Sequence, residues 1–528
     1  MVTQKAADLW RPLRNPTFRR LFLAGVVSDV GTFMQAVGSA WLMVSLGAGP
    51  LFVALTQTAS ALPFFVFALP AGAIGDIVDR RKLILYTEAW MVCVAAALAG
   101  ATIGGLMTPW LLLVMTFALS AGDALEAPTW HAVLPELVHK EDLPSASALN
   151  GLSFNIARAV GPALGGALIS VAGIGAAFVV NVVSFSAVIV AVARWKRPAD
   201  ARTVPPETLR GATIAAVRYV RNVPVMRALI VRSGIVIFFA SAPFALLPAV
   251  AHGVSDSAAG YGVLLGCFGG GAVGGAFVMQ WARARASTEV VVSTAVVILG
   301  TAIAALAGVH NLPGLMGVML LSGAAWITVI SVANALVQMM APDWVRARVL
   351  AIFMLVTQGG LAAGSAAWGA IAARAGIETA LAWAGVGTIA TTVFGLWMRL
   401  PDGVADVSPW NHWRMPAIVA DVAPKLEQGP VLITVHYRVE PKNREGFLQA
   451  MRKNERVRRR DGASRWGLYR DLERADVYLE TFIVVSWAEH LRQHERVTRS
   501  DGDVERLVQM RTDGEPTVRH FIHAESGH

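Results

Sequence analysis

Five polar or charged residues fall inside long apolar segments, where a charge is costly enough to suggest a function. They are Asp29, Asp123, Glu126, Asn155 and Arg158. A charged side chain at the centre of a bilayer costs about 2.5–3.5 kcal/mol on insertion scales. Asp123 and Glu126 are one helical turn apart and share a face. We expect Arg158 to pair with Asp29 or Asp123 beside a central cavity, and protonation of that acid to release the pair.

The same charges also have a structural interpretation, in which a static ion pair fixes the packing of the helices. Glu88 follows Lys82 by six residues, which places it nearer the membrane edge and favours a structural role. The glycine run at 262–277 has spacing similar to a dinucleotide-binding loop. Because it lies within an apolar helical segment, we expect it to serve close helix packing instead.

A charged motif follows the second apolar segment. GAIGDIVDRRK supplies Gly72, Asp76, Arg80 and Arg81. An acid at a helix end can cap the helix or accept from an arginine, so this motif could hold one helix bundle against another and act as a gating loop. The alternative is a basic loop that contains an acid by chance.

A glycine–proline motif lies in the fifth apolar segment. NIARAVGPALGGALI at 155–169 supplies Gly161, Pro162, Gly165 and Gly166. These residues let a neighbouring backbone approach closely and permit a kink. Ordinary small-residue helix packing is the alternative interpretation.

The apolar segments that carry these residues make up most of the chain. Of 528 residues, 55% are hydrophobic and 15% are charged, whereas about a quarter of a soluble domain is charged. The composition excludes disorder, collagen and, with two cysteines, a disulfide scaffold. A membrane-spanning helix needs about 20 apolar residues. Twelve such segments are predicted, at 21–46, 52–75, 83–104, 109–130, 145–170, 175–195, 228–250, 258–281, 288–308, 312–339, 347–373 and 378–399.

The net charge of +9 belongs to the first 400 residues, because residues 401–528 hold 20 basic and 20 acidic residues. The basic excess collects in connections after even-numbered spans, which is typical of cytoplasmic loops and explains the charge better than nucleic-acid binding. We therefore predict a multi-pass membrane protein with both termini in the cytoplasm. GPALGG at 161–166 matches GLAAGS at 360–365, which predicts two related six-helix halves.

The last part of the chain is predicted to be a cytoplasmic α+β domain. Alternating apolar residues indicate a strand at 431–440, helical spacing follows at 443–459, and a hairpin turns around 474–476. A second helix at 489–497 and a strand at 517–525 complete it. The predicted division is 1–195, the N-terminal six-helix half; 196–226, a cytoplasmic central loop; 227–400, the C-terminal half; 401–429, a linker; and 430–528, the tail domain.

His490 and His494 lie four residues apart on one face of the second tail helix. They could bind a metal or haem, but exposed positions or a pocket lining are the preferred interpretation. No metal site and no cofactor are therefore predicted.

Several of these segments resemble the major facilitator superfamily. Gly72, Asp76 and Arg80 match its signature between spans 2 and 3, although Ile77 replaces the usual basic residue. The motif at 155–169 resembles the span 5 motif of the superfamily's antiporters, which is associated with exporters, but the usual span 4 arginine of drug antiporters is not visible. Segments 15–35, 128–166 and 217–230 resemble the subgroup that contains the bacterial enterobactin exporter and related efflux permeases.

The tail also carries a resemblance. RWGLYRDLE at 465–473 and the segment 486–501 look like the C-terminal extension of some members of that subgroup. The order of strands and helices resembles the ferredoxin-like α+β fold of small antibiotic-biosynthesis monooxygenases, which dimerise through their sheets. The expected fold is thus an all-α membrane protein of 12 transmembrane helices in two six-helix halves, followed by an α+β ferredoxin-like domain.

The resemblance implies a secondary active transporter that works by alternating access in a lipid bilayer. It would export small amphipathic molecules, siderophore-like or drug-like, with protons as the coupling ion, and would be no enzyme. Dimerisation through the tail is a further expectation. The alternatives are a membrane-anchored enzyme with a monooxygenase-like tail, and an importer or lipid flippase on the same fold.

Overall fold

The computed structural model describes residues 9–139, 141–195, 209–403, 406–410 and 424–523. The side chains of 68–69, 72–77, 131, 209–210 and 212 lie outside this description. The described part contains 12 helical segments long and apolar enough to cross a membrane, so the predicted number of spans is confirmed.

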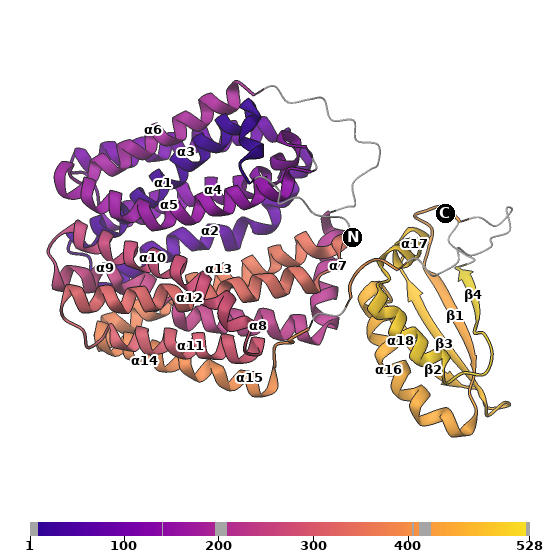
Figure 1. The fold of residues 1–528 in the computed structure, drawn as a ribbon. Helices are drawn as coiled ribbons and strands as arrows, with labels where there is room; N and C mark the ends of the chain where they lie inside the picture. The colour runs from indigo at the N-terminus through magenta and orange to yellow at the C-terminus, as the bar shows by residue number, and fades with distance from the viewer. Residues whose placement is uncertain (1–8, 140, 196–208, 404–405, 411–423, 524–528) are drawn as a thin grey trace. The chain divides into compact units, whose positions relative to one another are not determined.

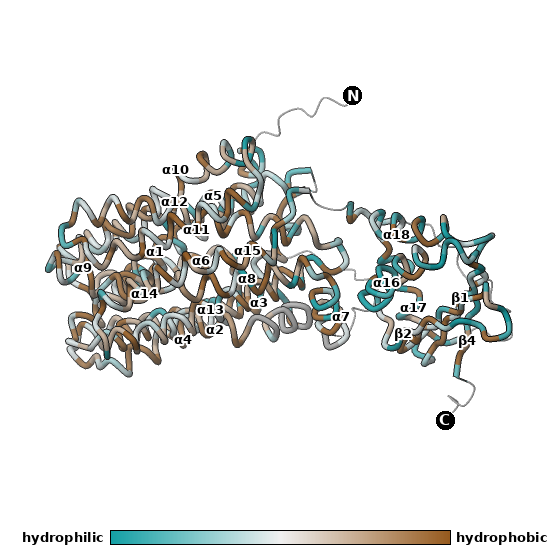
Figure 2. Tube along the Cα trace, turned by 90° about the horizontal axis from the view of Figure 1, so that it is seen from below, coloured by the Kyte–Doolittle hydropathy of each residue, from teal (hydrophilic) through white to brown (hydrophobic). Residues whose placement is uncertain are grey.

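The first six spans are single helices with short connections (Figure 1). Several begin at a proline, which suits the first turn because its missing N–H needs no partner there. Figure 2 shows hydrophobic residues along most of their length. Their bounds are α1 Pro16–Ser45, α2 Pro50–Ile77, α3 Arg80–Ile103, α4 Pro109–Leu137, α5 Leu143–Ala172 and α6 Ile174–Ala193, with a short 3₁₀ helix, Arg11–Arg14, before α1.

The second six spans include two interrupted helices. The seventh span breaks at Ser241 into α8 and α9, just before Pro243, whose ring cannot continue a helix without distortion. The twelfth changes from α14 through a 3₁₀ turn, Thr391–Val393, into α15. The bounds are α8 Pro224–Ala240, α9 Ala242–Val254, α10 Ala258–Arg283, α11 Thr288–Ala305, α12 Leu312–Met340, α13 Asp343–Ala375, α14 Ile377–Ala390 and α15 Phe394–Trp397.

The segment predicted as a central loop, 196–226, contains a helix that was not predicted. This helix, α7, spans Leu209–Asn222. Ala215, Ala216 and Tyr219 are buried, while Ile214 and Val217 are exposed. One side of α7 therefore packs against protein, which explains why a helix forms in a segment too charged to enter a membrane.

The tail is an α+β domain with a four-stranded antiparallel sheet in the order β2-β3-β1-β4. The predicted elements are present, and an additional helix, α18, follows α17. Alternate strand residues and the helices form one apolar core around Phe447, Met451 and Phe482. The bounds are β1 Val431–Arg438, a 3₁₀ turn Pro441–Asn443, α16 Arg444–Asp461, β2 Arg465–Arg470, β3 Val477–Val484, α17 Trp487–Arg496, α18 Arg499–Gln509 and β4 Thr517–Ile522.

The chain forms two compact units. One comprises most of both six-helix halves: Met1–Val204, Val231–Ala333 and Met354–Leu400. The other joins the tail to two segments from earlier in the chain, Pro205–Ile230 with α7 and Asn334–Phe353 around the α12–α13 connection.

Candidate functional site

The glycine–proline motif of α5 packs against two other spans. A Cβ atom on Gly165 would lie 2.8 Å from Met34 Cα on α1, and one on Gly161 would lie 2.6 Å from Phe33 Cβ. Gly166 instead faces α10 of the second half. The motif thus allows close packing within the first half and between the halves, as the small-residue pattern predicts.

The matching glycines of the second half occupy equivalent contacts. Gly360 and Gly364 of α13 pack against the backbone of α8 at Gly234 and Phe238. The pair in span 5 therefore faces span 1, and the pair in span 11 faces span 7. This correspondence agrees with two related six-helix halves.

The two halves also meet along other helices of the bundle. The Thr58 hydroxyl on α2 donates to the Ala362 carbonyl on α13 at 3.1 Å. Trp41 on α1 contacts two aromatic rings of the second half, with its centroid 5.6 Å from that of His252 and 6.5 Å from that of Tyr261. These rings lie near the bundle end where α1 ends and α10 begins.

Enlarging Gly166 is expected to separate α5 from α10. A Cβ atom there would lie 2.6 Å from the Ala258 carbonyl oxygen and 3.0 Å from Gly262 Cα. Overpacking costs about 1–3 kcal/mol, enough to shift a two-state equilibrium by about ten-fold. Gly166→Val should therefore increase thiol labelling of Ala258→Cys, measured in a background without Cys93 and Cys267.

Gly151→Val is the matched control, because no neighbouring atom lies within 4 Å of a Cβ at Gly151 on the same helix. Equal labelling of residue 258 in both variants would contradict a role for Gly166 in holding the halves together.

Four carboxylic acids from three spans lie in the first half. Asp29 is on α1, Glu88 on α3, and Asp123 and Glu126 on α4. Glu88 and Glu126 are only 3% and 8% exposed, and their carboxyl groups are close enough to hydrogen bond to each other. Such a bond needs a proton between the two acids. Among the described residues none of the four acids forms an ion pair.

The surroundings of this carboxylate cluster, Asp29, Glu88, Asp123 and Glu126, are sparse in polar groups. The Thr87 hydroxyl donates to Glu126 Oε2 at 2.7 Å, while Glu88 Oε2 is buried with no hydrogen-bond partner. Asp123 acts electrostatically on Asp29. Glu88, for which a structural role near the membrane edge was expected, is buried next to Glu126. The sequence signal that could have identified Glu88 as a candidate was a single acid within an apolar segment.

The expected ion pair between Arg158 and an acid is absent among the described residues. The guanidinium of Arg158 instead lies over the Phe154 ring, 4.9 Å from its centroid. Phe154 in turn packs against Phe33, at 5.6 Å between centroids. Asn155 donates from its side chain to the Gly151 carbonyl of its own helix at 2.8 Å. Neither polar residue of α5 therefore joins the carboxylate cluster in this structure.

Arg80 of the charged motif binds the end of α4. Its Nη1 donates to Glu136 Oε1 at 2.7 Å and to the Ala132 carbonyl at 2.8 Å. Gly72 and Asp76 lie in α2, but their side chains lie outside the described set. Whether Asp76 caps a helix or accepts from an arginine of the motif thus lies outside the described residues.

Arg81 binds the end of α6. It donates to the carbonyls of Val192 and Ala193 at 3.1 and 2.6 Å. Cations at a helix C-terminus satisfy free carbonyls and complement the helix dipole. The described contacts of the two arginines therefore hold the start of α3 within the first half.

The tail core contains a buried polar network around Glu480, which is fully buried on β3. Its Oε2 accepts from the Tyr437 hydroxyl at 2.7 Å. Its Oε1 accepts from Trp466 Nε1 at 2.8 Å, Asn454 Nδ2 at 3.2 Å and Arg458 Nε at 3.3 Å. Burial and the Glu480 carboxylate raise the pKa of Tyr437 well above its ordinary value, so Tyr437 remains a hydrogen-bond donor.

The two tail histidines belong to a buried aromatic cluster. Nε2 of His490 lies 3.3 Å from Nε2 of His494, and the His490 ring centroid lies 4.8 Å from that of His520 on β4. Burial and these two histidines lower the pKa of His490 to about 3, so its ring is neutral at physiological pH. Among the described residues, no three His, Cys, Asp or Glu side chains form a group suited to a metal.

Comparisons with known proteins agree with this architecture. Residues 7–528 match the sequence profile of a protein family described as transmembrane secretion effector. An enterobactin exporter of Citrobacter koseri is 27% identical over 78% of this chain and 96% of its own length. A multidrug efflux pump of Mycobacterium tuberculosis is 26% identical over 64% of this chain and 83% of its own length.

Solved structures with the same fold are transporters of the major facilitator superfamily. A bacterial homologue of the human lysosomal transporter Spinster, inward-facing and unoccupied, has a TM-score of 0.57 at 14% identity and covers 74% of this chain and 96% of its own. A nucleoside transporter has a TM-score of 0.61 at 10% identity and covers 72% of this chain and 100% of its own. At these identities the likeness concerns the fold alone.

Proposed function

Because the chain belongs to the transmembrane secretion effector family of major facilitator transporters, we propose that it exports small amphipathic molecules in exchange for protons. The observation that carries the coupling proposal is the buried Glu88–Glu126 pair inside the spans of the first half. Transport would proceed by movement of the halves, 1–195 and 227–400, about a site between them.

The proposed substrates are siderophore-like or drug-like. Two relatives that match most of their own length are named as an enterobactin exporter and a multidrug efflux pump. Arg158 beside Phe154 and Phe33 supports this choice, since a cation next to aromatic rings suits an aromatic, anionic molecule. We propose that Asn155 and Arg158 line the substrate path.

Proton exchange is proposed to take place at the carboxylate cluster. Two carboxyl groups that share a proton can release it when water reaches them and take it up from the other side of the membrane. Asp29 and Asp123 would pass the proton to or from Glu126. We propose that Gly72, Asp76, Arg80 and Arg81 form the gating loop and that Gly161, Pro162, Gly165 and Gly166 set the packing of α5.

The proposed location is the inner membrane with both termini in the cytoplasm. The positive charge of the connections after even-numbered spans supports this orientation. In that orientation, the short uncharged connections, such as the one between α5 and α6, face away from the cytoplasm.

We propose that the tail at 430–528 is not an enzyme. Both oxygens of Glu480, the buried acid in its core, already accept hydrogen bonds from protein donors, so this acid is committed to structure. A monooxygenase-like tail remains the second candidate, because the tail's strand order agrees with the ferredoxin-like fold of those enzymes. Deleting 401–528 separates the two, since a transporter retains gradient-driven export at a reduced rate, whereas an enzyme loses its chemistry altogether.

Dimerisation is proposed through the open face of the tail sheet. The strand register aligns Phe521, Leu432 and Ile483 in one row across β4, β1 and β3. Their neighbours in sequence, Ile433 and Phe482, point into the core. Phe521 is 48% exposed, and a row of apolar side chains on an open sheet face is suited to a second copy of the same surface.

Inverted membrane vesicles test the transport proposal. With an acidic interior they should accumulate enterobactin, or an anionic aromatic dye as a drug-like probe, and a protonophore should abolish the accumulation. Accumulation driven only by an alkaline interior would indicate an importer. Failure to move either probe would contradict the proposed substrate class.

A further inference from the structure

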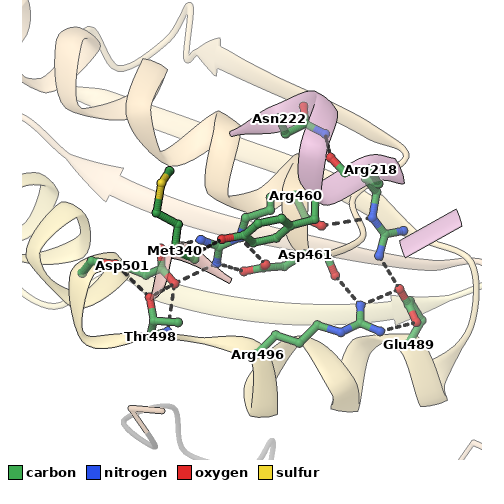
Figure 3. Close-up of polar contacts among 11 residues, drawn as sticks. Arg218, Asn222, Met340, Arg460, Asp461, Glu489, Arg496, Thr498 and Asp501 are labelled. Atoms are coloured by element: carbon green, nitrogen blue, oxygen red, sulfur yellow. Dashed lines mark hydrogen bonds and ion pairs between the residues drawn. The ribbon is translucent and has the colours of Figure 1, made fainter. Parts of the chain in front are cut away.

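Arg218 on α7 joins this helix to the tail (Figure 3). Its Nη2 lies 2.8 Å from Glu489 Oε1 on α17, and its Nε donates to the Arg460 carbonyl at the end of α16 at 3.0 Å. The side chains of Arg218 and Glu489 are 20% and 13% exposed. The pair is therefore largely withdrawn from solvent, unlike a typical surface ion pair.

Tyr219, the next residue of α7, reaches a different part of the chain. Its hydroxyl donates to the Met340 carbonyl at the end of α12 at 2.6 Å. Its ring lies edge-on to Trp344 on α13, with 6.0 Å between centroids. Tyr219 thus joins the segment before span 7 to the connection between spans 10 and 11.

Two tail arginines lie over these aromatic rings. The guanidinium carbon of Arg496 is 4.6 Å from the Trp344 ring centroid, and that of Arg460 is 5.9 Å from the Tyr219 centroid. Both arginines are less than 10% exposed. A desolvated cation is attracted to an aromatic face more strongly than an exposed one.

Acids of the tail hold these two arginines in place. Arg460 donates to both oxygens of Asp501, at 2.9 and 2.7 Å, and to both oxygens of its neighbour Asp461. Arg496 Nη1 donates to Glu489 Oε1 at 2.8 Å. The edges of both guanidinium groups are thus used within the tail, which leaves their faces to contact the aromatic rings.

Glu489 is the acid that both sides of this interface share. Its burial opposes ionisation, but hydrogen bonds and charge from Arg496 and Arg218 outweigh it and hold the pKa of Glu489 below its ordinary value. A lowered pKa means that the contribution to stability is present above the unfolded-state pKa, about 4.3, and is lost only on further acidification. The contact therefore persists at physiological pH.

We infer that the tail is a clamp that binds the chain's own segments at α7 and at Met340–Trp344, so that the ends of spans 7, 10 and 11 move as one piece during transport. All three spans belong to the second half. Rocking of a half requires its helices to move together. A folded domain that binds α7 and Trp344, with Tyr219 joining α7 to the end of α12, supplies that rigidity. This inference rests on the proposed transport function.

A graded series at Arg218 tests the clamp. Arg218→Lys should keep the charge opposite Glu489, lose the bond to the Arg460 carbonyl and loosen the tail least. Arg218→Ala should loosen the tail further, and Arg218→Glu should repel Glu489 and release it. Hydrogen exchange of the full chain in nanodiscs should show α7 exchanging about ten-fold faster in Arg218→Glu, the effect of losing about 1.4 kcal/mol. Protection of β1 and β3 should not change, which shows that the tail remains folded.

Transport is measured on the same variants. In Arg218→Glu we expect the maximal export rate to fall about three-fold or more, with an unchanged KM, since the substrate path is not touched. Arg221→Ala is the control, because Arg221 lies on the same helix and is exposed.

Two results would overturn the clamp: α7 exchange that does not respond to Arg218→Glu, or faster exchange of α7 with an unchanged export rate. If wild-type vesicles export neither probe, the proposed function fails, whereas the exchange measurement still decides whether Arg218 docks the tail.

Discussion

Replacing Glu126 by glutamine is expected to abolish proton-driven export while leaving downhill substrate movement. The amide has the shape of the acid but cannot take up and release a proton, so Glu88 and Glu126 can no longer share one. Coupling between two binding events is typically worth about 1–3 kcal/mol, or about 5–150-fold. We therefore expect the gradient-driven rate in inverted vesicles to fall by at least about ten-fold.

The control for this experiment is Glu378→Gln, the same chemical change at an exposed position at the start of α14. It should export like wild type. Glu88→Gln should resemble Glu126→Gln, because either change leaves one acid where two shared a proton. Full gradient-driven export by both cluster variants would show that protons do not couple through this pair.

Replacing Glu480 by glutamine is expected to have the largest effect on the stability of the tail. The change removes the carboxylate that faces Arg458, which is 7% exposed, and turns one of two acceptor oxygens into a donor. Breaking a buried ion pair on one side costs about 3–5 kcal/mol. The tail should unfold at correspondingly lower denaturant concentration.

Denaturant unfolding of the full chain in detergent, followed by hydrogen exchange of β1 and β3, measures this effect. Glu455→Gln is the matched control, since Glu455 forms a surface pair with Arg459 at 2.8 Å on α16, and such helix pairs contribute about 0.3–0.5 kcal/mol. Similar losses in both variants would mean that the Glu480 network does not hold the tail together.

The membrane part of the fold could be predicted because the bilayer imposes a local rule. Each span must supply about 20 apolar residues and satisfy its own backbone hydrogen bonds, and these requirements act on consecutive residues. The twelve predicted segments therefore match twelve helical segments. The break at Ser241 was also readable in principle, because Pro243 follows it within the seventh segment.

Most elements of the tail could also be predicted from patterns within short stretches of sequence. Alternation in 431–440 predicted β1, whose inward residues Ile433 and Val435 are buried. Helix α18 was not predicted, although Thr498 and Asp501 form a capping box three residues apart, which is a sequence signal for a helix start. Helix α7 was not predicted because the basic residues around it were interpreted as part of a cytoplasmic loop.

By itself, the sequence determined the membrane class, the number of spans, the α+β tail and the residues costly enough to be candidates. Only the tertiary structure decided which of them meet. Glu88 joins Glu126 from another helix, Arg158 lies over Phe154 instead of pairing with an acid, and Arg218 binds Glu489 although 271 positions separate them. Burial and periodicity act between neighbours in sequence, whereas such partners depend on how each helix is rotated and which helices pack together.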